Sequence, residues 1–320
     1  MGMLIDGVWS TDDQISAESD GQFKRAVSGF RNWITPDGNA GPTGVSGYAA
    51  ESGRYHLYVS HACPWAHRTM IFRNLKSLAL HISVDVVHPD MFEHGWQFTD
   101  GYTDSLNNHS HLHQIYAAAA PDMTGRVSVP VLWDKATNSI VSNESAEIIR
   151  MFNSAFNGLT GNDADYYPTS LRAEIDPVNE RIYQTLNNGV YRSGFARSQA
   201  AYDEAVGELF ETLDWVDDRL EHNRYIAGDV ITEADWRLFT TLLRFDAVYV
   251  THFKCDKRRI VDYPNTWAYA RELFQHPGVA ETVHMDHIRR HYFFSHESVN
   301  PTRIISIGAD ADWSEPHGRG

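Results

Sequence analysis

The feature that most constrains this chain is a single cysteine between a predicted strand and a predicted helix. The mostly apolar run at 56–59 predicts a short buried strand. A few residues later, Ile71, Leu75 and Leu78 recur at the spacing of an amphipathic helix. Cys63 is therefore expected at the N-terminus of a helix that follows the first strand of an α/β domain.

Further patterns complete a small mixed α/β domain. Apolar and polar residues alternate over 82–86, which predicts a second strand, and 129–133 and 140–141 predict a third and a fourth. A closing helix is predicted over 144–156. The order β-α-β, polar insertion, β-β-α is that of a thioredoxin-like fold, and we assign residues 54–157 to it.

The rest of the chain divides into an N-terminal arm and a helical C-terminal domain. Residues 1–53 are rich in Gly and Pro and look irregular, yet their large aromatic side chains predict an arm that packs on the protein. Over 165–320, apolar residues from Ala205 to Leu220 repeat at steps of three and four, which is typical of a long amphipathic helix. Thr232 and Asp235 form a capping box at the start of another helix. We therefore expect an all-α C-terminal domain.

Charge and composition exclude several classes of protein. The 320 residues carry 27 Lys and Arg against 42 Asp and Glu, a net charge of −15, so nucleic acid is not an expected partner. No apolar run approaches the roughly 18 residues that a membrane span needs, so no membrane association is predicted. The first ten residues lack the basic and apolar regions of a secretory signal. We predict a cytoplasmic protein.

The position of Cys63 favours nucleophilic chemistry. Pro64 is well suited to the first position of a helix, and the unpaired N–H groups and dipole of a helix N-terminus stabilise a thiolate. Such a thiolate is the nucleophile of disulfide exchange, but Ala66 stands where a Cys-x-x-Cys motif has its second cysteine. An external thiol must then release the mixed disulfide, and glutathione is the obvious cytoplasmic candidate. The other cysteine, Cys255, is interpreted as a buried structural thiol.

Two further segments could hold a peptide-like thiol. A cis bond between Val129 and Pro130 would turn the Val129 main chain towards such a ligand. Glu144 and Ser145 begin a predicted helix, where main-chain donors and a hydroxyl can receive a carboxylate while the Glu receives an ammonium group. Each residue also has a plainer explanation, since Pro130 could be an edge-strand proline and Ser145 a simple cap. Their joint occurrence with Cys63 favours the binding site.

The polar insertion contains His109, His111 and His113 at alternate positions. Alternate histidines can chelate zinc or nickel, but no cysteine or acid joins them at ligand spacing. We expect solvated histidines and no metal site.

Taken together, these motifs resemble the glutathione transferase superfamily and, within it, the cysteine-type glutathionyl-hydroquinone reductases, also called the Xi class. The resemblance covers nearly the whole chain. The segments that carry it are 23–25 and 30–34 in the arm, 63–68 at the cysteine, Trp96, 129–134, 143–145 and the 232–235 capping box.

The resemblance implies a glutathione transferase fold with the active site in a cleft between the two domains, a homodimer, glutathione as co-substrate and no tightly bound cofactor. It implies that Cys63 is the catalytic nucleophile. The residues implied to bind glutathione are Trp96, Val129, Glu144 and Ser145. The residues implied to lie over the second substrate are Tyr191, Tyr249 and Tyr292. From the residues alone, each of these tyrosines could equally be a core aromatic.

The leading functional hypothesis is glutathione-dependent reduction of glutathionyl-hydroquinones to hydroquinones, through a disulfide between Cys63 and glutathione, with release of oxidised glutathione. One alternative is an omega-like thiol transferase or dehydroascorbate reductase. A second alternative is a noncatalytic glutathione-transferase-like binding module, in which Cys63 would have the acidity of an ordinary thiol.

Overall fold

The computed structural model describes residues 2–11, 20–308 and 311–320. The chain forms two compact units. One unit, called the sheet unit below, contains residues 2–11 and Ala26–Ala164. The other, called the helical unit, contains residues 20–25 together with the described part of Asp165–Gly320. The arm is thus divided between the two units. None of the described helices is long and apolar enough to cross a membrane.

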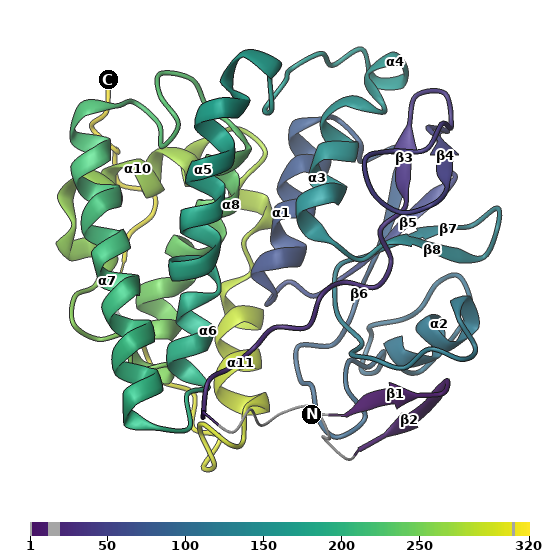
Figure 1. Ribbon diagram of the computed structural model, residues 1–320, viewed down its shortest axis with the longest axis horizontal. Coiled ribbons are helices and arrows are strands. Elements are labelled where there is room, and N and C mark those ends of the chain that lie inside the picture. Colours follow the sequence, from purple (N-terminus) through teal and green to yellow (C-terminus); the bar gives the residue numbers. More distant parts are fainter. Residues whose placement is uncertain (1, 12–19, 309–310) are drawn as a thin grey trace. The chain divides into compact units, whose positions relative to one another are not determined.

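The first unit is built on a four-stranded mixed sheet, with the strand order β6-β5-β7-β8 (Figure 1). Its strands are β5 (Tyr55–Val59), β6 (Ile82–Val86), β7 (Val131–Asp134) and β8 (Ser139–Ser142). Strand β5 pairs in parallel with β6 and antiparallel with β7, and β7 pairs antiparallel with β8. The thioredoxin-like order predicted from the sequence is confirmed.

Helices α1 (Pro64–Leu75) and α3 (Ser145–Ser154) pack against each other in this unit (Figure 1). All five residues of β5 are buried, as are Ile148 and Phe152 on the inner face of α3. The period of two in the strands and the period of 3.6 in the helices therefore place one apolar core between sheet and helices. A short helix, α4 (Asn157–Thr160), follows α3 near the end of this unit.

The prediction of an irregular arm was wrong for two of its segments, which form small two-stranded sheets. The antiparallel pair is β1 (Met3–Ile5) with β2 (Val8–Ser10), and the parallel pair is β3 (Trp33–Thr35) with β4 (Gly47–Ala49). The insertion likewise contains a helix that was not predicted, α2 (Leu112–Ala119). These elements are short, so their periodicity is weak in the sequence.

The turn between β1 and β2 carries a signal that sequence reasoning missed. Asp6 and Gly7 have φ of 47° and 76°, the left-handed pair that a two-residue hairpin requires, and Asp-Gly is a favoured sequence for it. A Cβ at Gly7 would lie 1.8 Å from the carbonyl oxygen of Pro121, so only glycine fits there.

The second unit is helical, as predicted, and no described residue beyond 142 lies in a strand. Its helices are α5 (Arg172–Ile182), α6 (Gly189–Gly194), α7 (Gln199–His222), α8 (Glu233–Arg244), α9 (Val250–His252), α10 (Pro264–Gln275) and α11 (Met285–Ser295). The predicted stripe on α7 is buried along its whole length, from Ala205 to Leu220.

The capping box at the start of α8 is the polar centre of this unit. The Asp235 carboxylate accepts hydrogen bonds from the Thr232 amide at 2.7 Å and from the Thr232 hydroxyl at 3.0 Å. It also accepts from the Ile226 amide at 2.9 Å and from the Tyr269 hydroxyl at 2.7 Å. Since Asp235 is fully buried, these bonds join α8 to the loop before it and to α10.

Candidate active site

Cys63 is the N-cap of α1, and Pro64 is the first residue of that helix. The Cys63 amide donates to the Ser60 carbonyl at 3.1 Å, and the Cys63 carbonyl accepts the first helical bond from His67 at 2.9 Å. The thiol is partly exposed, and its Sγ donates to the Val129 carbonyl at 3.5 Å. The strand-to-helix turn therefore holds the thiol at a helix N-terminus, where a thiolate is favoured.

The peptide bond between Val129 and Pro130 is cis, which was one of the two possibilities that the sequence left open. The third strand begins at Val131 rather than at Val129, because proline has no N–H for the ladder. Within the described residues, the Val129 N–H donates no hydrogen bond, while the Val129 carbonyl accepts the Cys63 thiol. A main-chain donor therefore remains beside the thiol for a ligand.

Glu144 and Ser145 stand at the start of α3. Glu144 is the N-cap, and its Oε1 accepts from the Ala146 amide at 3.0 Å. Ser145 is buried, and its hydroxyl accepts from Nη1 of Arg68 at 3.5 Å. The Arg68 guanidinium is itself buried and lies 4.5 Å from the centre of the Trp65 ring. The contact of Arg68 with Ser145 was not foreseen from the sequence.

Trp96 lies in the insertion, in the loop that leads to α2. It is 7% exposed, and its carbonyl accepts from the Leu112 amide at 2.9 Å. In the same unit, Cys63 contacts Val129, and Glu144 directly precedes Ser145 at the start of α3.

The three predicted tyrosines meet in the helical unit. The hydroxyls of Tyr191 and Tyr292 lie 2.5 Å apart, and those of Tyr249 and Tyr292 lie 3.2 Å apart. Burial raises the pKa of Tyr249 and of Tyr292 well above the ordinary tyrosine value. These two hydroxyls therefore remain protonated and able to donate hydrogen bonds at neutral pH.

Two of the tyrosines lie in or shortly after irregular helical turns. Tyr191 follows a π-helical turn at Tyr183–Asn187, and Tyr249 ends a second one at Phe245–Tyr249. A π turn inserts one residue and rotates the rest of the helix about its axis, and such turns are frequent at functional sites. Tyr292 comes from the regular helix α11. No pattern in the sequence predicted the π turns.

The arm contributes a cation to this cluster. The Arg25 guanidinium lies 4.7 Å from the centre of the Tyr191 ring, and its Nε donates to Asn188 Oδ1 at 2.9 Å. The ring of Phe23 also packs on that of Tyr191, with centres 6.5 Å apart. The prediction that the arm packs on the protein is confirmed here, although the sequence assigned no role to Arg25.

Buried histidines pack behind Tyr292. His252 Nε2 and His296 Nδ1 lie 3.1 Å apart, and the His291 ring is 5.2 Å from that of His296. Burial lowers the pKa of His252 to about 4 and holds that of His296 well below the ordinary histidine value. Both are neutral at pH 7. Sequence reasoning did not single out His252 or His296, since no spacing relates them.

Cys255 is fully buried in the same unit, and burial raises the pKa of its thiol. Its Sγ lies 3.8 Å from the Phe253 carbonyl oxygen. These features support the interpretation of Cys255 as a structural thiol.

Two of the three histidines of the insertion, His111 and His113, pack against other side chains rather than being simply solvated. His111 caps α2, and the ring of His113 stacks on that of Trp9 with centres 4.7 Å apart. Burial, and next His111, lower the pKa of His113 to about 4. Among the described residues, no group of three or more His, Cys, Asp or Glu side chains could hold a metal ion.

Comparison with known families and proteins agrees with this architecture. The model of the glutathione S-transferase N-terminal domain matches residues 62–155, and that of the C-terminal domain matches 199–272. The chain is 57% identical to glutathionyl-hydroquinone reductase YqjG of Escherichia coli, over 100% of this chain and 98% of that protein. It is 49% identical to glutathionyl-hydroquinone reductase PcpF of Sphingobium chlorophenolicum, over 96% of each.

The solved structure of glutathione-bound YqjG from E. coli superimposes on 99% of this chain and 99% of its own, with a TM-score of 0.92 and 56% identity. The resemblance seen in the motifs thus extends to the whole sequence and fold. The chain belongs to the glutathione S-transferase superfamily and, within it, to the glutathionyl-hydroquinone reductases.

Proposed function

We propose that this protein reduces glutathionyl-hydroquinones to hydroquinones, using glutathione as co-substrate and no tightly bound cofactor. The observation that carries the proposal is the placement of Cys63 at the N-cap of α1, with its sulfur on the Val129 carbonyl before a cis-proline. Ala66 removes any resolving cysteine from the motif, so the second thiol comes from solution. The similar E. coli protein, whose structure was solved with glutathione bound, carries the reductase name.

The first step forms a mixed disulfide. The Cys63 thiolate attacks the glutathionyl sulfur, and the bond between that sulfur and the aromatic carbon breaks. The electron pair of this bond stays on the ring carbon, which takes up a proton. The ring is thereby reduced to the hydroquinone, while the two sulfurs are oxidised to a disulfide.

The second step restores the enzyme. A glutathione thiolate attacks the glutathione sulfur of the mixed disulfide, oxidised glutathione leaves, and the Cys63 thiolate returns. The sum is one glutathionyl-hydroquinone and one glutathione converted to one hydroquinone and one oxidised glutathione.

Residues at the start of α3 and at the cis-proline are suited to hold glutathione. The Val129 N–H pairs with its peptide backbone, Glu144 receives the ammonium, and Ser145 with Arg68 receives the adjacent carboxylate. Trp96 covers the ligand and excludes water. These roles rest on the family resemblance and on the donors and acceptors that each residue presents.

The tyrosine cluster is suited to the aromatic substrate. Hydroxyls of Tyr191, Tyr249 and Tyr292 hydrogen-bond the hydroquinone oxygens and supply or relay the proton that the ring carbon takes. Raised tyrosine pKa values keep Tyr249 and Tyr292 in the donor form.

The proposal of a homodimer rests on the resemblance alone and is tested by light scattering. A cytoplasmic location rests on the need for reduced glutathione and is tested by cell fractionation.

Intact mass spectrometry tests the central step. After exposure to a glutathionyl-hydroquinone without free glutathione, the protein should gain one glutathione moiety, and Cys63→Ser should gain none and show no turnover. Cys255→Ser is the matched control, because that thiol is buried, and it should form the adduct as the wild type does.

Three outcomes would refute the assignment. Retained turnover in Cys63→Ser would show that Cys63 is not the nucleophile. Turnover of dehydroascorbate with none of the glutathionyl-hydroquinone would favour the omega-like alternative. Glutathione binding without either reaction, with Cys63 alkylated only at the pH of an ordinary thiol, would favour the binding module.

A further inference from the structure

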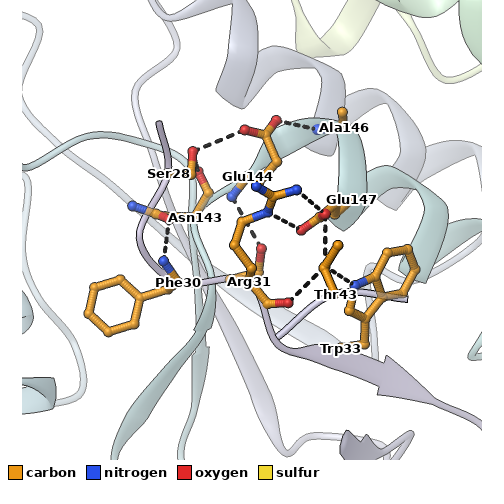
Figure 2. A network of polar contacts seen from close by, with 10 residues as sticks. Ser28, Phe30, Arg31, Trp33, Thr43, Asn143, Glu144, Ala146 and Glu147 are labelled. Atoms are coloured by element: carbon orange, nitrogen blue, oxygen red, sulfur yellow. Dashed lines mark hydrogen bonds and ion pairs between the residues drawn. The ribbon is translucent and has the colours of Figure 1, made fainter. Parts of the chain in front are cut away.

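The arm runs along the start of α3 as an added stretch of extended chain. The Phe30 carbonyl accepts from the Asn143 amide at 3.1 Å, and the Asn32 amide donates to the Val141 carbonyl at 3.0 Å. The arm therefore follows the chain from the end of β8 into α3, as Figure 2 shows for Phe30 and Asn143. This contact lies within the sheet unit.

From this position the arm reaches the carboxylate of Glu144. The Ser28 hydroxyl lies 3.0 Å from Glu144 Oε2 and 3.3 Å from the Asn143 carbonyl, while Oε1 accepts from the Ala146 amide at 3.0 Å (Figure 2). Both carboxylate oxygens are thus held. A carboxylate has about four acceptor positions, so these two contacts leave room for an ammonium group.

An ion pair anchors the arm beside this contact. Arg31 Nε donates to Glu147 Oε2 at 2.7 Å, and a second contact joins Nη2 to Oε1 (Figure 2). The Thr43 hydroxyl donates to the same Oε1 at 2.8 Å. The hydrogen bond with Glu147 raises the pKa of Arg31, against the opposing effect of burial. A two-bond Arg–carboxylate pair restricts geometry more than a single bond does, so the chain near Ser28 is fixed relative to α3.

The insertion also contacts Asn143, through Tyr116 of α2. Asn143 Nδ2 donates to the Tyr116 hydroxyl at 3.1 Å, and that hydroxyl donates to the Ser128 carbonyl at 2.8 Å. Asn143 Oδ1 accepts from the Phe30 amide at 3.1 Å. One buried side chain, Asn143, therefore joins the arm, α2 and the residue that precedes Val129.

We propose that Ser28 and Tyr116 are positioning residues for glutathione. Ser28 holds the Glu144 carboxylate where it receives the γ-glutamyl ammonium group, and Tyr116 holds the main chain that enters the cis-proline turn. The arm and the insertion are then parts of the glutathione site. This inference rests on the proposed function of Glu144 and Val129 in binding glutathione.

Kinetics and direct binding test the role of Ser28. Ser28→Ala should raise the KM for glutathione about threefold to tenfold, because a hydrogen bond to a charged group is lost, and leave kcat at saturating glutathione unchanged. Ser28→Thr keeps the hydroxyl and should restore the KM. Ser46→Ala, at an exposed serine of the same arm, is the matched control and should change neither. An unchanged KM in Ser28→Ala would overturn the proposal.

A double-mutant cycle separates positioning from general stability. If Ser28 acts through Glu144, Ser28→Ala should weaken glutathione binding in the wild-type background and add nothing in Glu144→Gln. Calorimetric binding in a Cys63→Ser background avoids any chemistry. Equal losses in both backgrounds would overturn the proposal. Absence of hydroquinone formation alongside intact, Ser28-dependent glutathione binding would instead refute the proposed reaction alone.

Tyr116 is tested against another buried tyrosine. Tyr116→Phe removes the hydroxyl between Asn143 and Ser128, and it should raise the KM for glutathione severalfold. Tyr55→Phe also removes a hydrogen bond from a buried tyrosine to a main-chain carbonyl, that of Ala49, but away from the site. It should lower stability without changing that KM. Equal KM changes in the two variants would overturn the role of Tyr116.

Discussion

Mild acid should destabilise the helical unit, because this unit contains buried histidines that are neutral at pH 7. His252 is 4% exposed, and its Nε2 lies 3.1 Å from Nδ1 of His296. Burial is the main cause that lowers the pKa of His252 from 6.5 to about 4, with smaller contributions from His291 and Lys254. The rings of Phe253, Tyr292 and Phe293 also pack on the His252 ring, with ring centres 5.0, 6.2 and 5.1 Å away.

The size and sign of the effect come from linkage. The unfolded chain binds a proton at His252 near pH 6.5, while the folded chain does so only near pH 4. Stability is therefore fully present above about pH 6.5 and is lost as the pH falls towards 4. Between pH 8 and pH 5 this single histidine lowers the free energy of unfolding by about 2 kcal/mol. Most carboxylates titrate below this window, so they contribute little to the change.

Urea denaturation at pH 8 and pH 5 measures this loss, and hydrogen exchange of α11 peptides assigns it to the helical unit. His252→Gln keeps a polar side chain beside His296 but cannot titrate. Its free energy of unfolding should fall by about 2 kcal/mol less than that of the wild type between the two pH values. His222→Gln, at the exposed end of α7, is the control and should behave as the wild type does. Identical pH dependence in His252→Gln and wild type would refute the reasoning.

Three other outcomes are expected. Asp235→Ala should lower the free energy of unfolding by about 3–5 kcal/mol, because it removes the acceptor of four buried hydrogen bonds; a loss below about 1 kcal/mol in urea denaturation would contradict this. Burial raises the pKa of Tyr249 and Tyr292, so stability should fall above about pH 10, where tyrosines of the unfolded chain ionise; a free energy of unfolding in urea that stays the same between about pH 9 and pH 11 would count against it. Cys255 should resist alkylation at pH 8 until the protein is denatured, and peptide mass mapping of the alkylated protein checks this.

The sequence predicted those parts of the fold that local patterns encode. Strand β5, the turn at Cys63 and helix α1 are encoded in one short stretch, because alternation and helical spacing are properties of neighbouring residues. The same holds for the stripe on α7 and for the Thr232 capping box. A cis bond before Pro130 was one possibility that its place at a strand start suggested, beside a plain edge-strand proline.

The features that the sequence did not reveal depend on contacts between distant segments. Ser28 and Glu144 are separated by 116 positions, and Arg25 and Asn188 by 163, so no spacing rule connects them. Helix α2 was hidden because its histidines suggested a solvated insertion, whereas the His111 cap and the stacking on Trp9 emerge only in the folded unit. Asp-Gly at the β1–β2 turn was readable and was missed.

A net charge of −15 opposes an anionic ligand at long range. Once the ligand is bound, the charges close to it affect its binding more than the net charge of the whole protein does. At physiological ionic strength, exposed charges are screened beyond about 8 Å, so most surface carboxylates have little effect on a group bound at α3. The Arg68 guanidinium is buried and touches the Ser145 hydroxyl at 3.5 Å, in a place where screening is weak. The main-chain donors at the α3 N-terminus add to this field. In the proposed site, Glu144, held by Ser28, would supply the negative charge that the ligand's ammonium needs. The proposed site therefore explains how an acidic protein can bind glutathione: it sets a charge of opposite sign against each end of the γ-glutamyl group.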